Sequence, residues 1–272
     1  MTLTEPLPLG DLLSLRDRTA VVTGSAEGIG AGIARRLAEA GAHVVIADRN
    51  LDGAEATAAE LRAAGGSAEA IGLDVLEPAS FDDLASVLRE AGRVPTVWVN
   101  NAGAYPKRSA LDLTVDEWDR MLDINVRSTF LGAQLAARMM SDAGLPGVIL
   151  NMSSIAGVRL APANPIDYAA AKAGVAMLTR NLGVELGPLG IRVVGLAPGF
   201  VVTPGVTRTP GVSARIGNPA SIPALGRQMD ADDVARVALF LVSDMASMIS
   251  SEIVVVDGGG AWNLETPTPA RP

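Results

Sequence analysis

The sequence predicts a single doubly wound α/β domain with a parallel sheet. Short β-branched apolar runs alternate with longer alanine- and leucine-rich stretches of helical period along most of the 272 residues. A glycine-rich turn at 23–30 joins the first apolar run to the first helical stretch. Because right-handed crossovers place helices on each side, repeated strand–helix units imply a parallel sheet that is covered on both faces.

The apolar runs predict seven strands, most of them fully buried: 19–23, 43–48, 67–74, 96–100, 147–152, 192–195 and 252–257. The periodic stretches between them predict helices at 29–40, 51–64, 79–91, 114–143, 167–186 and 230–244. Thr114 followed by Glu117 matches a capping box at the start of one helix. We expect an N-terminal arm over 1–17, a domain over 18–260 and a proline-rich tail over 261–272.

Composition excludes several classes of function. A formal charge of −8 argues against nucleic acid or an anionic membrane surface as a partner. The absence of cysteine excludes disulfides, thiolate metal sites and cysteine nucleophiles, and the single histidine, His43, argues against histidine-based triads and metal sites, so no metal is expected. Residues 1–17 do not match a signal peptide and no apolar run reaches the ~18 residues of a membrane span, which predicts a cytoplasmic protein.

The turn from Thr23 to Gly30 has the features of a pyrophosphate site. Its glycines allow close approach of phosphate to the N-terminus of the next helix, where free N–H groups and the helix dipole favour negative charge. A merely tight turn is the alternative, but the second strand ends in Asp48, whose carboxylate can bind adenosine ribose hydroxyls. Asp48 would repel the 2′-phosphate of NADP and Glu27 adds negative charge, which favours NAD, whereas Arg49 could reach toward a 2′-phosphate.

Tyr168 and Lys172 lie four residues apart in a predicted helix, so their side chains share one face. A free phenol has a pKa of about 10, and a nearby cation favours the phenolate. The pair therefore predicts a general acid/base that needs no histidine, with an accidental, solvated pair as the alternative.

A proline- and glycine-rich segment at about 198–225 interrupts the strand–helix rhythm. Long irregular loops in compact domains are often functional, which favours a lid over a ligand. A plain surface excursion is the alternative.

The sequence resembles the short-chain dehydrogenase/reductase family from about Arg18 to Gly259. The motifs that carry the resemblance occur in family order: Thr-Gly-x-x-x-Gly-x-Gly at 23–30, Asp74-Val75, Asn100-Asn101-Ala102-Gly103, Asn125, Asn151-Met152-Ser153-Ser154, Tyr168 to Lys172, and Pro198-Gly199 with Thr203.

This resemblance implies a seven-stranded Rossmann-like sheet in the order 3-2-1-4-5-6-7 and a catalytic set of Ser, Tyr, Lys and Asn. Tyr168 would be the general acid/base, and Lys172 would lower its pKa and bind the nicotinamide ribose. Ser154 would orient the substrate oxygen, with Ser153 as the alternative. Asn125 would hold a water that links Lys172 to solvent.

The resemblance and the turn together predict a nicotinamide cofactor site. Asp74 and Val75 would contact adenine, and Val201 and Thr203 the nicotinamide carboxamide. The predicted cofactor-binding residues are Gly24, Ser25, Glu27, Gly28, Ile29, Gly30, Asp48, Arg49, Asp74, Val75, Asn101, Ala102, Gly103, Tyr168, Lys172, Pro198, Gly199, Val201 and Thr203.

The substrate side is predicted to be mostly apolar. Its candidate residues are Tyr105, Ile155, Arg159 and Phe200, with Leu160 as a further wall. Arg159 could bind a carboxylate or phosphate of the substrate or could be a solvated charge, and Lys107 and Arg108 are equally open.

The predicted activity is hydride transfer between NAD and a small secondary alcohol or ketone, with Tyr168 as acid/base. One alternative is an NADPH-dependent 3-oxoacyl-thioester reductase, and another is a non-catalytic dinucleotide-binding or scaffold protein. The resemblance also implies a homotetramer or dimer formed through helices 114–143 and 167–186 and the last strand. Trp262 would be an interface anchor or part of the core.

Overall fold

The computed structural model describes residues 7–105, 109–159, 165–208, 213–218 and 221–260. Its centre is a seven-stranded sheet in the order β3-β2-β1-β4-β5-β6-β7, with every neighbouring pair parallel. The strands are β1 (Thr19–Thr23), β2 (His43–Asp48), β3 (Ser67–Gly72), β4 (Pro95–Asn100), β5 (Gly147–Met152), β6 (Ile191–Pro198) and β7 (Ile253–Val256). The predicted fold class and strand order are confirmed.

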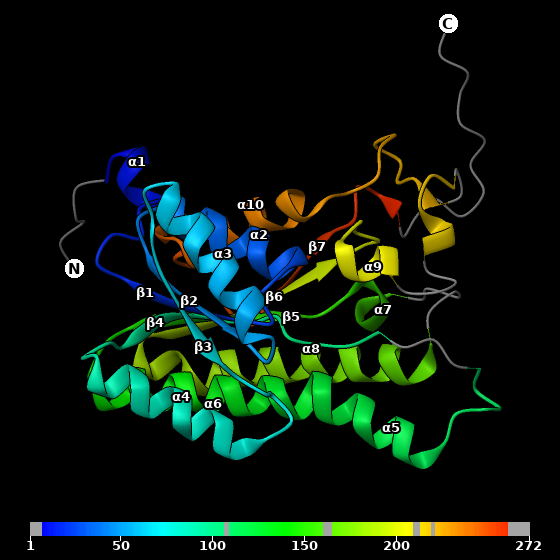
Figure 1. Ribbon diagram of the computed structural model, residues 1–272, viewed down its shortest axis with the longest axis horizontal. Coiled ribbons are helices and arrows are strands. Elements are labelled where there is room, and N and C mark those ends of the chain that lie inside the picture. The colour runs from blue at the N-terminus through cyan, green and yellow to red at the C-terminus, as the bar shows by residue number, and fades with distance from the viewer. Residues whose placement is uncertain (1–6, 106–108, 160–164, 209–212, 219–220, 261–272) are drawn as a thin grey trace, which may run out of the picture.

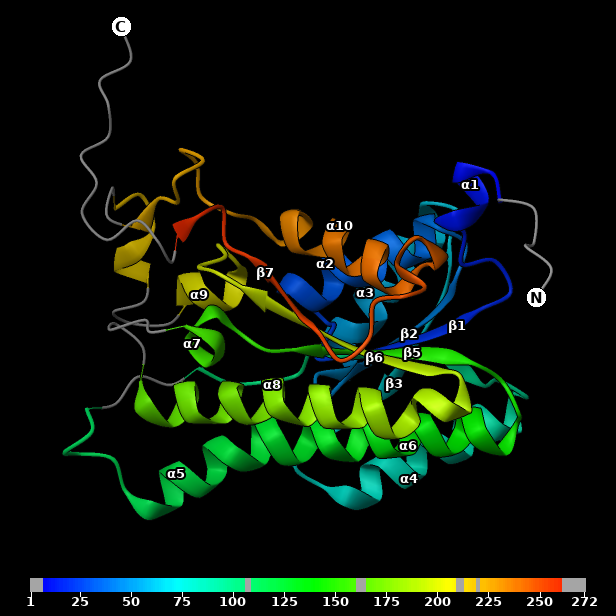
Figure 2. The same cartoon turned by 180° about the vertical axis from the view of Figure 1, so that it is seen from behind.

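Helices cover both faces of the sheet, as Figures 1 and 2 show from opposite sides. One layer contains α2 (Gly28–Glu39), α3 (Leu51–Ala63) and α10 (Ala231–Val242). The other contains α4 (Pro78–Glu90), α5 (Val115–Leu122), α6 (Ser128–Asp142) and α8 (Ile166–Leu186). Three short helices were not predicted: α1 (Leu9–Leu12), α7 (Ile155–Val158) and α9 (Pro204–Arg208). Figure 1 shows α7 and α9 together at the end of the molecule opposite α1.

Each helical layer closes its own hydrophobic core. Val22 of β1 and Val99 of β4 belong to the core under α2, α3 and α10. Val21 and Trp98, their neighbours along the same strands, belong to the core under α4 and α6. Successive residues of a strand point to opposite faces, so a strand buried on both faces must be apolar throughout. This is why the central strands are continuous runs of apolar residues in the sequence.

The helix predicted over 114–143 is present as one uninterrupted helical stretch from Val115 to Asp142, made of α5, a π-helical turn and α6. Its start is as expected, because the N–H of Glu117 donates to Thr114 Oγ1 over 3.2 Å and the N–H of Thr114 donates to Glu117 Oε2 over 3.1 Å. Between α5 and α6, however, Asp123–Arg127 form a π-helical turn. Such turns are rare, occur mostly inside α-helices and are frequent at functional sites. This one contains Asn125.

Four strands differ from their predicted limits. β4 begins one residue earlier, at Pro95, and β7 is shorter by one residue at each end, at Ile253–Val256. β3 ends at Gly72 instead of residue 74, and β6 runs from Ile191 to Pro198 instead of 192–195. β6 is longer because it lies between β5 and β7, which together supply partners along its length. Its buried end at Pro198 leads directly into the proline- and glycine-rich segment.

The strand order reverses between β1 and β4, and a crevice beyond the strand ends is expected at such a point. The two turns that follow these strands are bonded to each other. Thr23 Oγ1 accepts hydrogen bonds from the N–H groups of Asn101 (3.1 Å) and Ala102 (3.0 Å), and Asn101 Nδ2 donates to the Gly24 carbonyl over 2.8 Å. A Cβ at Gly24 would lie 2.7 Å from Ala102 Cα, so only glycine fits this contact.

Candidate active site

Tyr168 and Ser154 meet at the carboxyl end of β5. Ser154 is the N-cap of α7, and its Oγ accepts a hydrogen bond from the N–H of Ala156 over 3.2 Å. Tyr168 lies in the first turn of α8, and its hydroxyl is hydrogen-bonded to the side chain of Ser154. Two hydroxyls that the sequence separates by fourteen positions thus face each other.

Ser153, the alternative to Ser154, has a different environment. It is buried, and its Oγ donates to the backbone carbonyl of Lys172 over 2.9 Å. Its hydroxyl therefore fastens α8 to the end of β5, whereas the hydroxyl of Ser154 is the one bonded to Tyr168.

Lys172 is buried on the same side of α8 as Tyr168. Its Nζ donates to the carbonyl oxygen of Met152 over 2.8 Å and lies 5.7 Å from the centroid of the Tyr168 ring. The predicted i, i+4 relationship is therefore present.

Burial sets the pKa values of this pair. Burial raises the pKa of Tyr168 to about 12. The hydrogen bond with Ser154 acts in the opposite direction and lowers this pKa, and the neighbouring Tyr105 raises it further. Burial lowers the pKa of Lys172 to about 8. The expectation that Lys172 brings the pKa of Tyr168 below its ordinary value is therefore corrected, because the loss of water around the phenol is the largest influence on this pKa and raises it.

Asn125, in the π-helical turn, is fully buried. Its Nδ2 donates to the carbonyls of Met121 (3.1 Å) and Ala104 (3.3 Å). Its Oδ1 has no hydrogen-bond partner among the described residues. A Cβ built at Gly103 would lie 2.7 Å from this oxygen and 3.5 Å from Lys172 Nζ, so a glycine separates the two side chains. Asn125 Oδ1 is a buried acceptor beside the lysine.

The carboxylate of Asp48 is held against the glycine-rich turn. Its Oδ2 accepts from the N–H of Ala26 over 3.0 Å and its Oδ1 from the N–H of Asn50 over 2.9 Å. Arg49 next to it is exposed. Gly28, the first residue of α2, has a positive φ of 65°, and a Cβ there would lie 3.6 Å from the Thr203 Cβ.

Glu27 is not an uncompensated charge. It forms an ion pair with Arg208, the last residue of α9. The expectation that Glu27 adds negative charge beside the turn and so favours NAD is therefore corrected, because Arg208 compensates this charge. No local pattern could reveal a partner 181 positions away.

The remaining predicted cofactor residues lie at other strand ends. Asp74 is held by Ser80 Oγ, which accepts from its N–H over 3.0 Å, and Val75 beside it is buried. Val201 is buried and forms a β-bridge with Met229.

The positive-φ glycine turn, the Asp48 carboxylate and the buried Asn125 oxygen fit a dinucleotide that extends from the glycine-rich turn toward Tyr168. The other members of the predicted set (Ser25, Ile29, Gly30, Asn101, Ala102, Gly103, Pro198 and Gly199) belong to the same turns and strand ends.

Of the predicted substrate residues, Tyr105 and Phe200 take part in one side-chain cluster with Tyr168. The rings of Tyr105 and Tyr168 are 4.6 Å apart at 89°, an edge-to-face contact. The Tyr105 hydroxyl is hydrogen-bonded to Arg215, whose Cζ lies 4.3 Å from the centroid of Phe200. Sequence reasoning missed Arg215, because it stands in the segment without periodicity and no motif marks it.

Ile155 is the first residue of α7 and Arg159 is its C-cap, and both are half-buried. Lys107, Arg108, Leu160, Trp262, residues 1–6 of the predicted arm, parts of the 198–225 segment and nearly all of the predicted tail lie outside the described residues.

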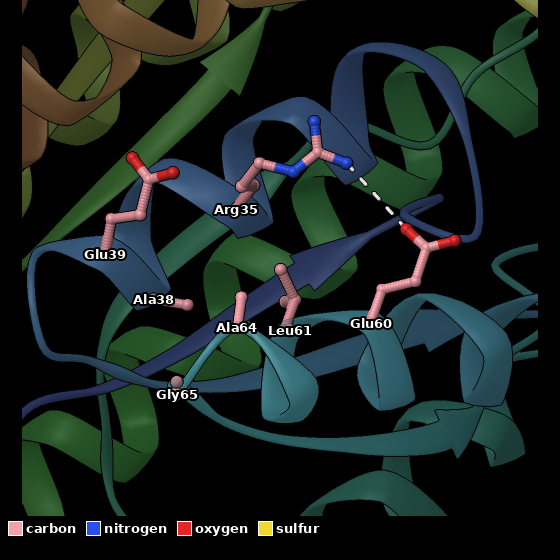
Figure 3. Close-up of a pocket in the computed structure, with 8 residues that line it drawn as sticks. Arg35, Ala38, Glu39, Glu60, Leu61, Ala64 and Gly65 are labelled. Atoms are coloured by element: carbon pink, nitrogen blue, oxygen red, sulfur yellow. Dashed lines mark ion pairs between the residues drawn. The ribbon is translucent and has the colours of Figure 1, made fainter.

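A surface cavity of about 320 Å³ lies elsewhere, between α2 and α3 (Figure 3). Its lining residues are Arg35, Ala38, Glu39, Glu60, Leu61, Ala64, Gly65 and Gly66. Figure 3 shows Arg35 and Glu60 reaching toward each other across one side, with a nitrogen–oxygen distance of 3.8 Å. It shares no residue with the cluster around Tyr168 and is not part of the candidate active site.

No helix in the described part of the chain is both long and apolar enough to cross a membrane. Likewise, the described ranges contain no group of three or more His, Asp or Glu side chains placed to hold a metal ion.

Comparison with known proteins identifies the family. A family model described as enoyl-(acyl carrier protein) reductase matches residues 24–261. 3beta-Hydroxysteroid dehydrogenase 1 of Eggerthella lenta is 37% identical over 247 residues, which cover 90% of this chain and 94% of the relative. Cis-4-hydroxycyclohexanecarboxylate dehydrogenase of Sinomonas cyclohexanicum is 42% identical over 251 residues, which cover 89% of this chain and 96% of the relative.

The fold comparison agrees. A solved structure of 7α-hydroxysteroid dehydrogenase, complexed with NADH and 7-oxo glycochenodeoxycholic acid, has a TM-score of 0.85 and 34% identity, and the match covers 93% of this chain and 98% of that one. The extent of these matches, together with the sheet order, shows that the chain is an oxidoreductase of the NAD(P)-binding short-chain dehydrogenase/reductase family.

Proposed function

We propose that this protein oxidises a cyclic secondary alcohol to a ketone, and catalyses the reverse reduction, with NAD(H) as cofactor and Tyr168 as general acid/base. The observation that carries the proposal is the convergence of Tyr168, Ser154 and Lys172 at the carboxyl end of β5. The names of two relatives, which act on a hydroxysteroid and a hydroxycyclohexanecarboxylate, support a hydroxyl on a saturated ring.

In this proposal the substrate oxygen lies between the hydroxyls of Ser154 and Tyr168. Bound NAD would take the hydride from the alcohol carbon. Tyr168 takes the hydroxyl proton in oxidation and returns it to the carbonyl oxygen in reduction, while Ser154 holds that oxygen by a hydrogen bond. With a pKa near 12, the phenol carries its proton at neutral pH and is ready to act as an acid.

Lys172 and Asn125 have supporting roles in the proposal. Lys172 is fixed by the Met152 carbonyl, which leaves its other two N–H donors for the nicotinamide ribose and for a water. The buried Asn125 Oδ1 accepts a hydrogen bond from that water. A proton can then pass between Tyr168 and solvent through Lys172.

The preference for NAD rests on Asp48. Its carboxylate is fixed by two backbone N–H groups at the turn, where the adenosine ribose would lie. A charged 2′-phosphate placed there would be repelled. Asp48 supports NAD by itself, since Glu27 is paired with Arg208.

The test is a fluorescence titration with NADH and NADPH separately, followed by turnover of cyclic secondary alcohols. Tighter binding of NADH and alcohol oxidation that is lost in Tyr168→Phe would support the proposal. Preference for NADPH with reduction of 3-oxoacyl thioesters would favour the second candidate, to which the acyl-carrier description of the family model points. Binding of neither cofactor would contradict both.

The homotetramer or dimer and the cytoplasmic location stay predictions. Exposed apolar side chains on α5, α6 and α8 support self-association: Val115, Phe130, Ile166, Met177 and Val184. The mass in solution, measured by light scattering, tests this.

A further inference from the structure

The segment after β6 brings a cation to the substrate side of the site, and we propose that Arg215 binds a carboxylate of the substrate. The inference rests on the proposed function, because it specifies which cyclic secondary alcohols the site takes: those that carry a carboxylate across the ring from the hydroxyl.

Arg215 is placed by two contacts to the candidate substrate residues. Its guanidinium lies over the ring of Phe200, with Cζ 4.3 Å from the centroid, and it is hydrogen-bonded to the Tyr105 hydroxyl. A guanidinium that stacks on an aromatic ring contacts the ring with its flat face. Its N–H groups lie in the guanidinium plane and stay available as hydrogen-bond donors. With five N–H donors, Arg215 can bond Tyr105 and still bind a carboxylate through two parallel hydrogen bonds.

The backbone around Arg215 is also fixed. Gln228 Nε2 donates to the Arg215 carbonyl over 3.1 Å, and Gln228 Oε1 accepts from the N–H of Gly217 over 3.2 Å. Gln228 precedes Met229, which bridges to Val201 just beyond β6. These contacts connect the backbone at Arg215 to the end of the sheet where Tyr168 and Ser154 lie. The arginine therefore has a fixed position relative to the candidate active site.

The charges around Arg215 indicate whether this arginine is available to bind an anion. The chain has a net charge of −8, so an anionic substrate needs a local cation at the site. Most arginines near this segment are neutralised, as Arg208 is by Glu27 and Arg227 is by Asp233. The ion pairs formed among the described residues include Arg208 with Glu27 and Arg227 with Asp233 but none of Arg215.

The contacts also set the shape of the ligand. The Tyr105 ring, edge-to-face with the Tyr168 ring at 4.6 Å, stands between the acid/base and Arg215. In this proposal a substrate that reaches both groups packs its ring along Tyr105, with its hydroxyl at one end and its anion at the other. A 4-hydroxycyclohexanecarboxylate has this arrangement.

The turnover experiment compares cis-4-hydroxycyclohexanecarboxylate with its neutral carboxamide. We expect the wild type to prefer the acid. Arg215→Met should lower kcat/KM for the acid by roughly 10- to 100-fold, the range for a charge-assisted hydrogen-bonded pair, and change the amide by less than about threefold. Arg215→Lys should restore part of the loss. Arg227→Met, the matched control in the same part of the chain, should leave both substrates unaffected.

A binding experiment separates failure of this inference from failure of the proposed function. Cyclohexanecarboxylate lacks the reacting hydroxyl, and its binding is measured by calorimetry with and without NADH. Binding that disappears in Arg215→Met supports the inference even if no alcohol is oxidised, in which case only the proposed function fails. Absence of carboxylate binding, or equal losses on acid and amide in Arg215→Met, would overturn the role of Arg215 and leave the alcohol oxidation standing.

Discussion

Lys172 Nζ donates its hydrogen bond to the carbonyl of Met152, 2.8 Å away, and lies 5.7 Å from the ring centroid of Tyr168. The last residue of β5 thus fixes the ammonium next to the phenol. Lys172 is buried and Tyr168 is half-buried, and the loss of water around them moves their pKa values in opposite directions, that of Tyr168 to about 12 and that of Lys172 to about 8.

Tyr168→Phe should reduce turnover to less than about a tenth of the wild-type rate, a loss of more than ~1.4 kcal/mol in barrier terms. The ring and its contact with Tyr105 remain, while the proton donor is lost. NADH affinity, measured by fluorescence, should stay within about threefold. Retention of more than a tenth of the rate would remove Tyr168 from the acid/base role.

Alcohol oxidation should accelerate as pH rises from about 7 to 10. The phenol, with a pKa near 12, holds its proton at neutral pH and must release it before it can accept another. Ketone reduction uses the protonated phenol and should change little over the same range. Initial rates of kcat/KM in both directions give the test, and an oxidation optimum at or below pH 7 would contradict it.

The free energy of unfolding should rise with pH between about 8 and 10.5 because of Lys172. In this window the unfolded chain holds the lysine proton and the folded protein does not, and stability increases with pH wherever the unfolded state binds more protons. A shift from 10.5 to about 8 corresponds to a rise of up to about 3 kcal/mol.

Urea titrations of the cofactor-free protein at pH 7.5 and 10.5 measure this effect. The same titrations on Lys172→Met isolate the lysine from other groups that titrate in this range. Equal pH dependence in the wild type and the variant would show that Lys172 keeps its ordinary pKa.

Ser154→Ala and Ser153→Ala should have different effects. The first removes the hydroxyl bonded to Tyr168 and should lower kcat by roughly 10- to 100-fold with little change in stability. The second removes a buried bond to the Lys172 carbonyl and should cost about 1 kcal/mol of stability. Chemical denaturation and steady-state kinetics on both variants check this. A larger loss of kcat in Ser153→Ala than in Ser154→Ala would assign the catalytic role to Ser153 and the structural role to Ser154.

Asp48→Ala should narrow the preference for NAD over NADP. The change removes the charge that would repel a 2′-phosphate, together with the acceptor for the Ala26 N–H. Asp48→Asn is the companion variant, because it removes the charge and keeps a carbonyl acceptor. We expect the ratio of kcat/KM values for NAD and NADP to fall by at least about tenfold in both, by analogy with the cost of one close like-charge contact. An unchanged ratio would place Asp48 outside the cofactor site.

Much of the fold was predictable because its signals are local. An apolar run such as Val44 to Ala47 is buried on both faces and predicts a central strand, and Thr114 with Glu117 predicts a helix start. The Tyr168–Lys172 spacing predicts a shared helix face whatever the rest of the chain does. Family motifs then supplied the strand order, which the structure confirms.

By itself, the sequence determined the strands, most of the helices and the identity of the residues that meet at the strand ends, since these depend on short-range period and spacing. Only the tertiary structure decided that Asn125 sits in a π-helical turn, that Arg208 neutralises Glu27, and that Arg215 reaches Tyr105. It also decided the pKa values of Tyr168 and Lys172. These features depend on contacts between distant segments and on the exclusion of water, and neither leaves a periodic trace in the chain.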